Sequence, residues 1–468
     1  MSVESRETSL RVSYSGVRGI YGESLTLPVA AQFGEAFAML VERRFPNPTV
    51  ITGRDTRPSG EALLPAIIGG LTRLPCSLVD VGVVPTPTVE VAMGEFGAHA
   101  AIIITASHNP AEWNGFKFLI GPHNIVLNAG ETAELFDLSR RSAAEIPASP
   151  PPVPISRHRE ALDAHIRLVL RQVDVPAIQR RRFKVAVDSC LGAGVDVTRR
   201  LLEELGCDVV PIMVERDSEP VAANLRALMA AVVENECDLG LAQDMDADRL
   251  ALVTEQGAAI GEEYTLAFAV DHLLNRHASA APVVVKNSST SRMIDDLCAA
   301  HGATLREVKV GEVNLGQAMI ELANQGRTVF GGEGNGGVIY PPVCYGRDSL
   351  IGIALILEYA AAAGQPLSQL AANLPRYHII KRKLTGLPPE RMSEALARAR
   401  QLFPGESVSE FDGLKVTFAD GSWCQVRPSN TEPIVRVITE SPSLATAEGL
   451  YHRVEAELAP LLSSSHAQ

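Results

Sequence analysis

The sequence has no long apolar run, no close pair of cysteines and no excess of positive charge. Its most apolar stretch, residues 350–364, is interrupted by Glu358 and is shorter than the roughly 20 residues that a membrane-spanning helix needs. The N-terminal residues are charged and polar, and they lack the apolar region of a secretory signal. We therefore expect a cytoplasmic protein with no membrane partner.

The charge and the cysteines exclude further classes of protein. A formal net charge of −13 argues against a nucleic-acid partner or a general affinity for anionic membranes. A small anionic substrate remains compatible with this charge, because it needs only a local group of arginines and lysines. The seven scattered cysteines contain no C-x-x-C pair, which favours reduced thiols over a disulfide framework or a zinc site.

What the chain does contain is a repeated alternation of short apolar strands with helix-like stretches, the pattern of α/β domains. Its 468 residues suggest three or four domains, and the proline-rich segment 147–158 is typical of a stiff connection. The last part differs, with alternating strands around a polar loop and then a terminal helix, which predicts a small α+β domain. The predicted domains are three related α/β units and this last one, with boundaries 1–155, 156–256, 257–374 and 375–468.

The first polar loop that carries chemistry ends the apolar run in "IIITASHNP", residues 102–110. Taken alone, such a strand end is more often an ordinary turn. However, "EWNGFKF" follows it and could bring Lys117 back to the same edge of the sheet. Ser107 is therefore a candidate nucleophile, with His108 beside it.

The second loop is "QDMDADR", residues 243–249. Its three alternate aspartates can converge hard oxygen ligands on one Mg²⁺, and without a cation they would repel one another strongly; they are Asp244, Asp246 and Asp248. An EF-hand calcium loop also has acids at alternate positions, but it requires a glycine where Arg249 stands and a helix where "LALV" predicts a strand. We reject the EF-hand interpretation.

Two further loops suit a phosphorylated sugar. In "GGEGNGGVIYP", residues 331–341, Glu333 and Asn335 offer an acceptor and a donor to neighbouring hydroxyls, although a plain glycine turn is the simpler interpretation. In "RPSNTEP", residues 427–433, an arginine fork and short polar side chains match a phosphate site. Its candidate ligands are Arg427, Ser429, Asn430 and Thr431.

In this order the four segments resemble those of the α-D-phosphohexomutase family, which moves phosphate between the C1 and C6 oxygens of a hexose. "TASHNP" is similar to the family's phosphoserine loop, "DMDADR" to its metal loop, "GEGNGG" to its sugar loop and "RPSNTEP" to its phosphate loop. Weaker matches are "SGVRGIYG" at 15–22, "GRDTRPSG" at 53–60 and "PTPT" at 85–88. The resemblance implies four domains around a central cleft, in agreement with the organisation above.

The resemblance also implies roles for individual residues. Ser107 would be phosphorylated and would share Mg²⁺ with the three aspartates, and a hexose 1,6-bisphosphate would act as activator. Lys117, beside Arg18, would have a lowered pKa and act as a general base or acid. The transferring group would be surrounded by Arg18, His108, Lys117 and Arg249. Glu333 and Asn335 would bind the sugar, the phosphate loop would hold the distal phosphate, and Lys286 would face the cleft.

Several positions depart from the family pattern. Met245 stands where the metal loop usually has glycine, and Asn335 and Gly337 stand where many members have serine and histidine. Glu312 stands where several sugar-phosphate mutases have histidine, and the usual "FGT" of the N-terminal loop is missing. We expect these changes to affect the choice of sugar more than the reaction.

The expected function is that of a phosphohexomutase, with phosphoglucosamine mutase favoured over phosphomannomutase or phosphoglucomutase. A metal-dependent sugar-phosphate phosphatase and a non-catalytic sugar-phosphate sensor are the alternatives from other classes. A phosphatase has no need of a second phosphate site, and a sensor has no need of a nucleophile. The expected partner is a small sugar phosphate, and the expected state is a monomer or a homodimer.

Overall fold

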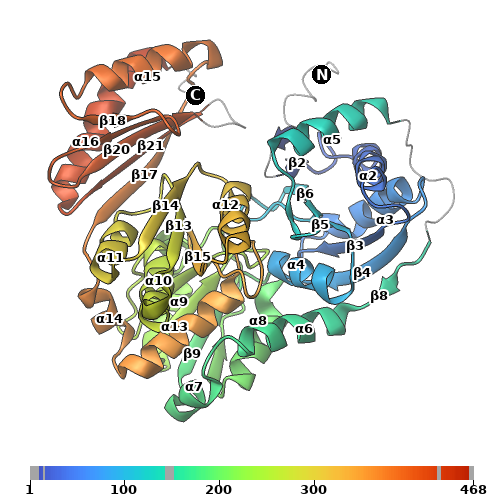
Figure 1. The fold of residues 1–468 in the computed structure, drawn as a ribbon, viewed down its shortest axis with the longest axis horizontal. Helices are drawn as coiled ribbons and strands as arrows, with labels where there is room; N and C mark the ends of the chain where they lie inside the picture. The colour runs from blue at the N-terminus through green and yellow to red at the C-terminus, as the bar shows by residue number, and fades with distance from the viewer. Residues whose placement is uncertain (1–9, 14–15, 143–151, 429–433, 463–468) are drawn as a thin grey trace.

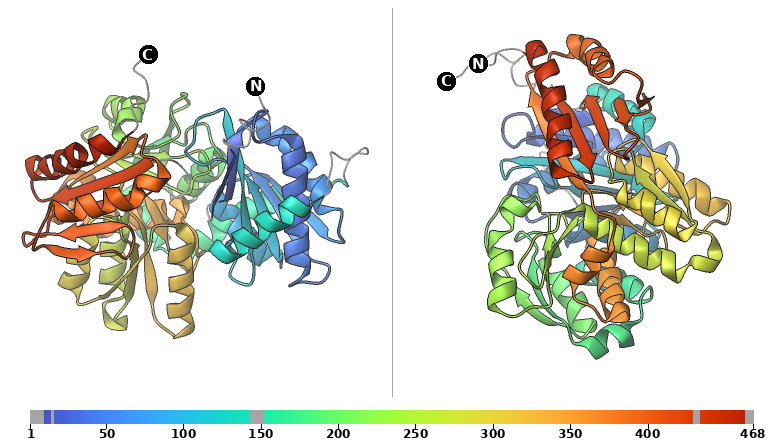
Figure 2. Two further views of the ribbon diagram at one scale, coloured as in Figure 1. Left: turned by 90° about the horizontal axis from the view of Figure 1, so that it is seen from above. Right: turned by 90° about the vertical axis from the view of Figure 1, so that its left-hand side faces the viewer.

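The computed structural model describes residues 10–13, 16–142, 152–428 and 434–462. Four β-sheets follow one another along this part of the chain (Figure 1). The first and the last lie on opposite sides of the molecule, as the two further views also show (Figure 2).

The first sheet is mixed, and its four central strands run in the order β4-β3-β5-β6. β3 is parallel to β4 and β5, whereas β6 is antiparallel to β5. The strands are β1 Arg11–Ser13, β2 Gly16–Ile20, β3 Thr49–Arg54, β4 Ser77–Val83, β5 Ala100–Ile104, β6 Trp113–Ile120, β7 Ile125–Val126 and β8 Ile155–Ser156. The helices are α2 Leu27–Glu42, α3 Ser59–Leu71, α4 Thr86–Glu95 and α5 Ala129–Arg141.

β5 is apolar throughout because it is buried on both faces. Ile102 and Ile104 pack in a core that includes residues of α2 and α3, whereas Ile103 packs in another that includes residues of α4. A strand covered on both faces has no polar alternation, and its polar residues therefore appear only at its end. This burial fixes the direction in which residues 105–108 leave the sheet.

The second and third sheets repeat this arrangement. Their strand orders are β10-β9-β11-β12 and β14-β13-β15-β16, again with three parallel strands and an antiparallel fourth. The strands are β9 Lys184–Asp188, β10 Asp208–Pro211, β11 Leu239–Gln243, β12 Leu250–Thr254, β13 Val283–Asn287, β14 Thr304–Val308, β15 Val329–Glu333 and β16 Gly337–Ile339. The helices are α6 His158–Leu170, α7 Val175–Arg181, α8 Gly194–Glu204, α9 Arg226–Glu234, α10 Glu263–Arg276, α11 Met293–His301, α12 Glu312–Asn324, α13 Ser349–Ala363 and α14 Leu367–Asn373.

The last sheet is antiparallel, in the order β17-β21-β20-β19-β18, and packs against α15 and α16. Its elements are β17 His378–Thr385, α15 Met392–Gln401, β18 Ser407–Ser409, β19 Leu414–Thr417, β20 Trp423–Pro428, β21 Ile434–Ser441 and α16 Leu444–Leu458. The predicted fold class, three related α/β domains and a small α+β domain, is confirmed. The domain boundaries given above stay predictions.

The alternation of strands and helices along the sequence predicts helices over residues 221–234 and 290–300, and both begin later in the structure. The helix expected over 221–234 starts at Arg226, because the backbone of Leu225 (φ −101°, ψ 16°) lies outside the helical region. The helix expected over 290–300 starts at Met293, whose N–H is bound by the Ser291 hydroxyl at 3.1 Å. Side chains that bind the local backbone compete with helix formation in this way.

No single helix among the described residues is long and apolar enough to cross a membrane. α13 and α14 meet the length and composition criteria only as a pair, and they are bent by 87°.

A buried polar chain joins the first three domains. His165 Nδ1 lies 2.8 Å from Thr88 Oγ1, and its Nε2 lies 2.9 Å from Asp348 Oδ2. Asp348 also caps α13 by accepting the N–H of Leu350 at 2.8 Å. The side chains of Thr88, His165 and Asp348 are fully buried. The loss of one would therefore leave polar atoms of its partners without a hydrogen bond and out of reach of water.

We predict that Asp348→Ala lowers the free energy of unfolding by about 3 kcal/mol, since it removes a cap and leaves His165 without its partner. Asp174→Ala is the matched control, because Asp174 caps α7 at an exposed position and should cost only about 1 kcal/mol. Denaturant titration of both variants measures the difference. Equal losses would show that the buried chain adds nothing to stability.

Candidate active site

Three of the predicted loops occupy the same place in the three α/β domains, the hairpin between the third and fourth strands. These hairpins are residues 105–112, 244–249 and 334–336. The first two meet where the Ser107 hydroxyl donates to Asp244 Oδ2 at 3.1 Å. The second and third meet where Leu250 N donates to the carbonyl of Gly336 at 3.0 Å. The repeated topology therefore brings three distant segments together.

Ser107 lies on a tightly held turn. Its φ of 51° is in the left-handed region, which is uncommon for residues other than glycine and is found at strained functional sites. Its N–H donates to Thr105 Oγ1 at 2.9 Å, and its carbonyl accepts from Arg57 Nη2 at 2.9 Å. Arg57 is itself paired with buried Asp55, so "GRDTRPSG" acts as the support of the serine loop.

The three aspartates are fully buried and form the group of acidic residues in the described chain that could hold a metal ion, with ligand oxygens within 4.8 Å of one another. Both oxygens of Asp244 accept hydrogen bonds, Oδ2 from Ser107 and Oδ1 from the N–H groups of Asp248 and Arg249 at 3.2 Å. Asp246 and Asp248 each have one oxygen held by the protein. Asp246 Oδ2 accepts from Lys117 and Thr86, both at 2.7 Å, and Asp248 Oδ2 accepts from Lys117 at 2.9 Å. Among the described residues, the other oxygens, Asp246 Oδ1 and Asp248 Oδ1, are buried and accept no hydrogen bond.

This arrangement fits a hard divalent cation such as Mg²⁺. Buried carboxylate oxygens without a donor are costly, and a cation would satisfy them. Burial and then the charges of Asp248 and Asp246 raise the pKa of Asp244 well above its ordinary value, and a cation bound beside the three carboxylates would offset this repulsion. The hydrogen bonds to the opposite oxygens fix the orientation of the ligands, as outer partners do in metal sites.

Met245 does not impede this loop. The residue with left-handed backbone is Ala247, with a φ of 51°, rather than Met245. Residues 250–254 form strand β12, which confirms the rejection of an EF-hand.

The predicted lowering of the Lys117 pKa is wrong in this structure. Burial alone would lower it, but the pairs with Asp246 and Asp248 raise it above the ordinary value for lysine. The sequence suggested Arg18 as the neighbour of Lys117, and it could not show that the lysine ends between two carboxylates. Lys117 is therefore held as an ammonium.

Arg18, His108 and Arg249 lie around the serine. Burial, followed by the opposing effects of nearby charges, lowers the pKa of Arg18 to about 10, and its Nη1 donates to Asn109 Oδ1 at 2.7 Å. His108 Nδ1 lies 3.3 Å from Ser107 Oγ and 2.9 Å from Arg249 Nη2. Burial and then the two arginines lower the pKa of His108 well below its ordinary value, so the ring is neutral.

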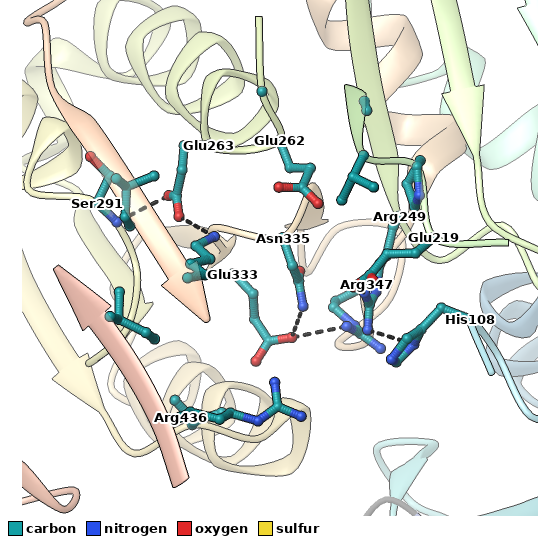
Figure 3. Close-up of a pocket in the computed structure, with 18 of the residues that line it drawn as sticks. His108, Glu219, Arg249, Glu262, Glu263, Ser291, Glu333, Asn335, Arg347 and Arg436 are labelled. Atoms are coloured by element: carbon teal, nitrogen blue, oxygen red, sulfur yellow. Dashed lines mark hydrogen bonds and ion pairs between the residues drawn. The ribbon is translucent and has the colours of Figure 1, made fainter. Parts of the chain in front are cut away.

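Glu333 and Asn335 lie together on the wall of the cleft (Figure 3). Asn335 Nδ2 donates to Glu333 Oε2 at 3.1 Å, and Asn287 Nδ2 donates to Glu333 Oε1 at 2.8 Å. Arg347 Nη1 also donates to Glu333 Oε2, at 2.9 Å. Sequence reasoning missed Arg347, whose one signal is its place in "GRDS", a polar stretch directly before the most apolar helix.

Lys286 is not among the residues that line the cleft. Its buried ammonium pairs with Asp295 and donates to the carbonyls of Thr290 and Ser291 at 3.4 and 3.3 Å. The resemblance implied that Lys286 faces the cleft, but the loop after β13, residues 288–292, folds over it. The structure thus favours a role in supporting that loop over direct contact with a sugar.

The last domain contributes a row of cations. Lys383, Arg436 and Arg427 lie directly opposite one another on β17, β21 and β20, and all three line the cleft. Figure 3 shows Arg436 reaching into the pocket. An anion bound at this row would be attracted by three positive charges. Ser429, Asn430 and Thr431 lie outside the described residues.

Residues of all four domains line one cleft of about 1050 Å³, among them Arg18, His108, Lys117, Arg249, Glu333, Asn335, Arg347 and the cationic row. Ser107 and the three aspartates are not lining residues, but they contact the lining residues His108, Lys117, Arg249 and Arg347. Its serine and metal side is formed by the first two domains, its sugar side by the third and its cationic row by the fourth. The arrangement can hold a nucleophilic hydroxyl beside a cation, bind a polyol and bind a distal anion.

The chain matches models of four successive domains of one protein family. They are described as phosphoglucomutase/phosphomannomutase alpha/beta/alpha domain I (residues 11–141), domain II (163–257) and domain III (261–377), and C-terminal domain (380–457).

Two similar proteins cover nearly the whole chain. One from Thermococcus kodakarensis, named "Phosphoglucomutase/phosphomannomutase", is 37% identical over 442 residues, which are 92% of this chain and 94% of that protein. One from Methanopyrus kandleri, named "Probable phosphoglucosamine mutase", is 34% identical over 446 residues, which are 93% of this chain and 95% of that protein. A solved structure of a phosphoglucomutase/phosphomannomutase family protein from Burkholderia thailandensis shares the fold, with a TM-score of 0.80, 24% identity and coverage of 97% of this chain and 99% of that one.

We predict that Thr86→Val weakens Mg²⁺ binding about tenfold, because Asp246 loses the hydroxyl that orients it. Thr88→Val is the matched control: it lies two residues along the same helix and is equally buried, but it contacts His165. Calorimetric titration of the folded variants with Mg²⁺ gives both dissociation constants. The same constant for both variants would contradict the assignment of the orienting hydroxyl.

Proposed function

The chain belongs to the phosphoglucomutase/phosphomannomutase family and is a phosphohexomutase, and from this premise we propose that it works through a phosphorylated Ser107. Hexose 6-phosphate and hexose 1-phosphate would interconvert by way of a hexose 1,6-bisphosphate. The observation that carries the proposal is the 3.1 Å contact between the Ser107 hydroxyl and Asp244 in a buried acidic site.

The transfer needs charge stabilisation more than covalent chemistry. The P–O bond to Ser107 Oγ breaks while a sugar hydroxyl forms a new P–O bond to the same phosphorus. The sugar hydroxyl loses its proton, and Ser107 Oγ gains one, so the serine hydroxyl is restored. Mg²⁺, held by the three aspartates, would offset negative charge on the phosphoryl oxygens. Arg18 and Arg249 would add to this effect, and the ammonium of Lys117 is in the state required of a general acid.

The distal phosphate would bind to the last domain. The row formed by Lys383, Arg436 and Arg427 supplies three positive charges on one face of the sheet, and Arg427 is itself the first residue of the predicted phosphate loop. An arginine fork binds phosphate in two-point contacts. Because one pose cannot present both C1 and C6 to Ser107, the bisphosphate must turn within the cleft, and its second phosphate must be held in each orientation.

The sugar we propose is glucosamine phosphate. Glu262, Glu312 and Glu333 line the cleft, and a carboxylate attracts a protonated amine more than a hydroxyl. The name of the Methanopyrus kandleri protein agrees with this choice. Glucose or mannose phosphate is the second candidate, because the 37% identical Thermococcus kodakarensis protein is named for those sugars.

We also propose several properties that no contact among the described residues tests. These are the domain boundaries, a cytoplasmic location, a monomer or homodimer, and activation by a hexose 1,6-bisphosphate.

We predict that Ser107→Ala lowers isomerisation by about 10³-fold or more while sugar-phosphate binding persists, because only the nucleophile is lost. Ser139→Ala on α5 is the control, since Ser139 is buried outside the cleft. The assay follows kcat/KM with glucosamine, glucose and mannose 6-phosphates, Mg²⁺ and a catalytic amount of 1,6-bisphosphate.

Three results would contradict the proposal. Release of inorganic phosphate without isomerised product would indicate a phosphatase, and binding without turnover would indicate a sensor. Unchanged turnover by Ser107→Ala would reject the nucleophile. A higher kcat/KM for glucose or mannose phosphate would reject glucosamine phosphate as the substrate and leave the proposed reaction intact.

A further inference from the structure

Arg347 lies between the metal loop and the sugar loop and contacts both. Its Nη2 donates to Asp248 Oδ2 at 2.6 Å, and its Nη1 donates to Glu333 Oε2 at 2.9 Å. A third carboxylate, of Glu312, lies 3.4 Å from Nη2. One guanidinium therefore offsets three largely buried carboxylates, and Figure 3 shows it beside Glu333 on the wall of the pocket.

The backbone that carries Arg347 is fixed from several domains. Gly346 N donates to Glu90 Oε2 of α4 at 2.9 Å, and Arg347 N donates to Glu312 Oε1 at 2.9 Å. Asp348 binds His165, and the Ser349 hydroxyl accepts from Gln243 Nε2 at 2.7 Å. Residues 346–349 cannot follow a displaced side chain, so the position of the guanidinium is set by its carboxylate partners.

Gly337 provides the room for this arginine. A Cβ at position 337 would lie 2.3 Å from Arg347 Cδ and 2.8 Å from its Cγ. Any side chain there would push the stem of Arg347 away from its present place. Glu312 and Gly337, two of the departures from the family pattern in the sequence, are thus both explained by contact with Arg347.

The hydrogen bonds of Arg347 affect both Asp248 in the metal loop and Glu333 in the sugar loop. Arg347 and Lys117 hold Asp248 Oδ2, which leaves Oδ1 for a cation. Arg347 and Asn335 hold Glu333 Oε2, and burial is outweighed mainly by Arg347, so that the pKa of Glu333 is lowered. Because the guanidinium is planar and its donors are fixed, it cannot move toward one carboxylate without weakening its bond to the other.

We propose that Arg347 is a positioning residue that couples the metal site to the sugar loop through Asp248 and Glu333. The coupling rests on the proposed function, because it assumes that Asp248 binds Mg²⁺ and that Glu333 binds the sugar. A change of charge at Glu333 then alters how strongly Arg347 binds Asp248, and so alters the affinity for Mg²⁺.

The test is a double-mutant cycle on Mg²⁺ affinity, measured by calorimetry on the full chain. Glu333→Gln is made in the wild type and in Arg347→Met. In the wild type, Glu333→Gln removes the charged partner of Nη1. Arg347 then pairs more strongly with Asp248, and Mg²⁺ binding weakens. In Arg347→Met this path is absent, and we expect the effect of Glu333→Gln to be smaller by about threefold or more.

Because Glu333→Gln is compared in both backgrounds, the effect that Arg347→Met alone has on the affinity for Mg²⁺ cancels. Gly337→Ala is the second probe, since it displaces the arginine and keeps every charge, and it should reduce the coupling to a similar degree. Gly449→Ala, with no atom within 4 Å of the added Cβ, and Arg276→Met, which removes an arginine paired with Glu358 away from the cleft, should leave it unchanged.

A kinetic measurement separates positioning from mere stability. With Mg²⁺ saturating, Arg347→Lys keeps the charge, but one ammonium cannot span both carboxylates, so the KM for hexose phosphate should rise about tenfold and kcat should change less. Thermal unfolding of each variant shows whether it is folded.

An equal effect of Glu333→Gln in both backgrounds would overturn the role of Arg347 while leaving the proposed function intact. A wild-type protein that binds no Mg²⁺ would reject the metal site itself, and the coupling with it. Normal KM in Arg347→Lys would show that charge alone is required.

Discussion

The structure depends on one constraint: three carboxylates are buried within 4.8 Å of one another and must be compensated. Lys117 and Arg347 each approach Asp248 within 3 Å, and Thr86 and Lys117 bind Asp246. These partners come from different domains, so the compensation of one acidic loop also fixes the domains relative to one another. The oxygens that remain without donors face the place where a cation would complete the site.

The shared topology explains how this convergence arises. In each α/β domain the hairpin after the third strand leaves the same edge of its sheet, and the three hairpins carry a serine, an acidic loop and a glycine-rich loop. One connection, used three times, thus supplies a nucleophile, metal ligands and a sugar-binding wall. The last domain follows a different plan, and its antiparallel strands place cationic side chains in a row that faces the same cleft.

The sequence predicted the parts of this site that are local. The apolar run of β5 and the alternate aspartates of 244–248 each carry their own signal. That Ser107 and the aspartates meet was implied by the resemblance to the phosphohexomutase family. The partners of Lys117 were mispredicted because they lie 129 and 131 residues away, whereas Lys286 is covered by the loop that directly follows it, whose path the sequence did not show. Arg347 was missed because its three carboxylate partners lie 14 to 99 residues away. Glu312 and Glu333 become its neighbours when the third domain folds, and Asp248 does so only when the second and third domains pack.

The central claim is that Ser107 and the three aspartates form one metal site. Anomalous diffraction from crystals of the Ser107-phosphorylated protein grown with Mn²⁺ tests it directly. The account predicts one strong peak bonded to Asp244, Asp246, Asp248 and the seryl phosphate. A phosphorylated protein with no peak there, or with its ion bound elsewhere in the cleft, would contradict it.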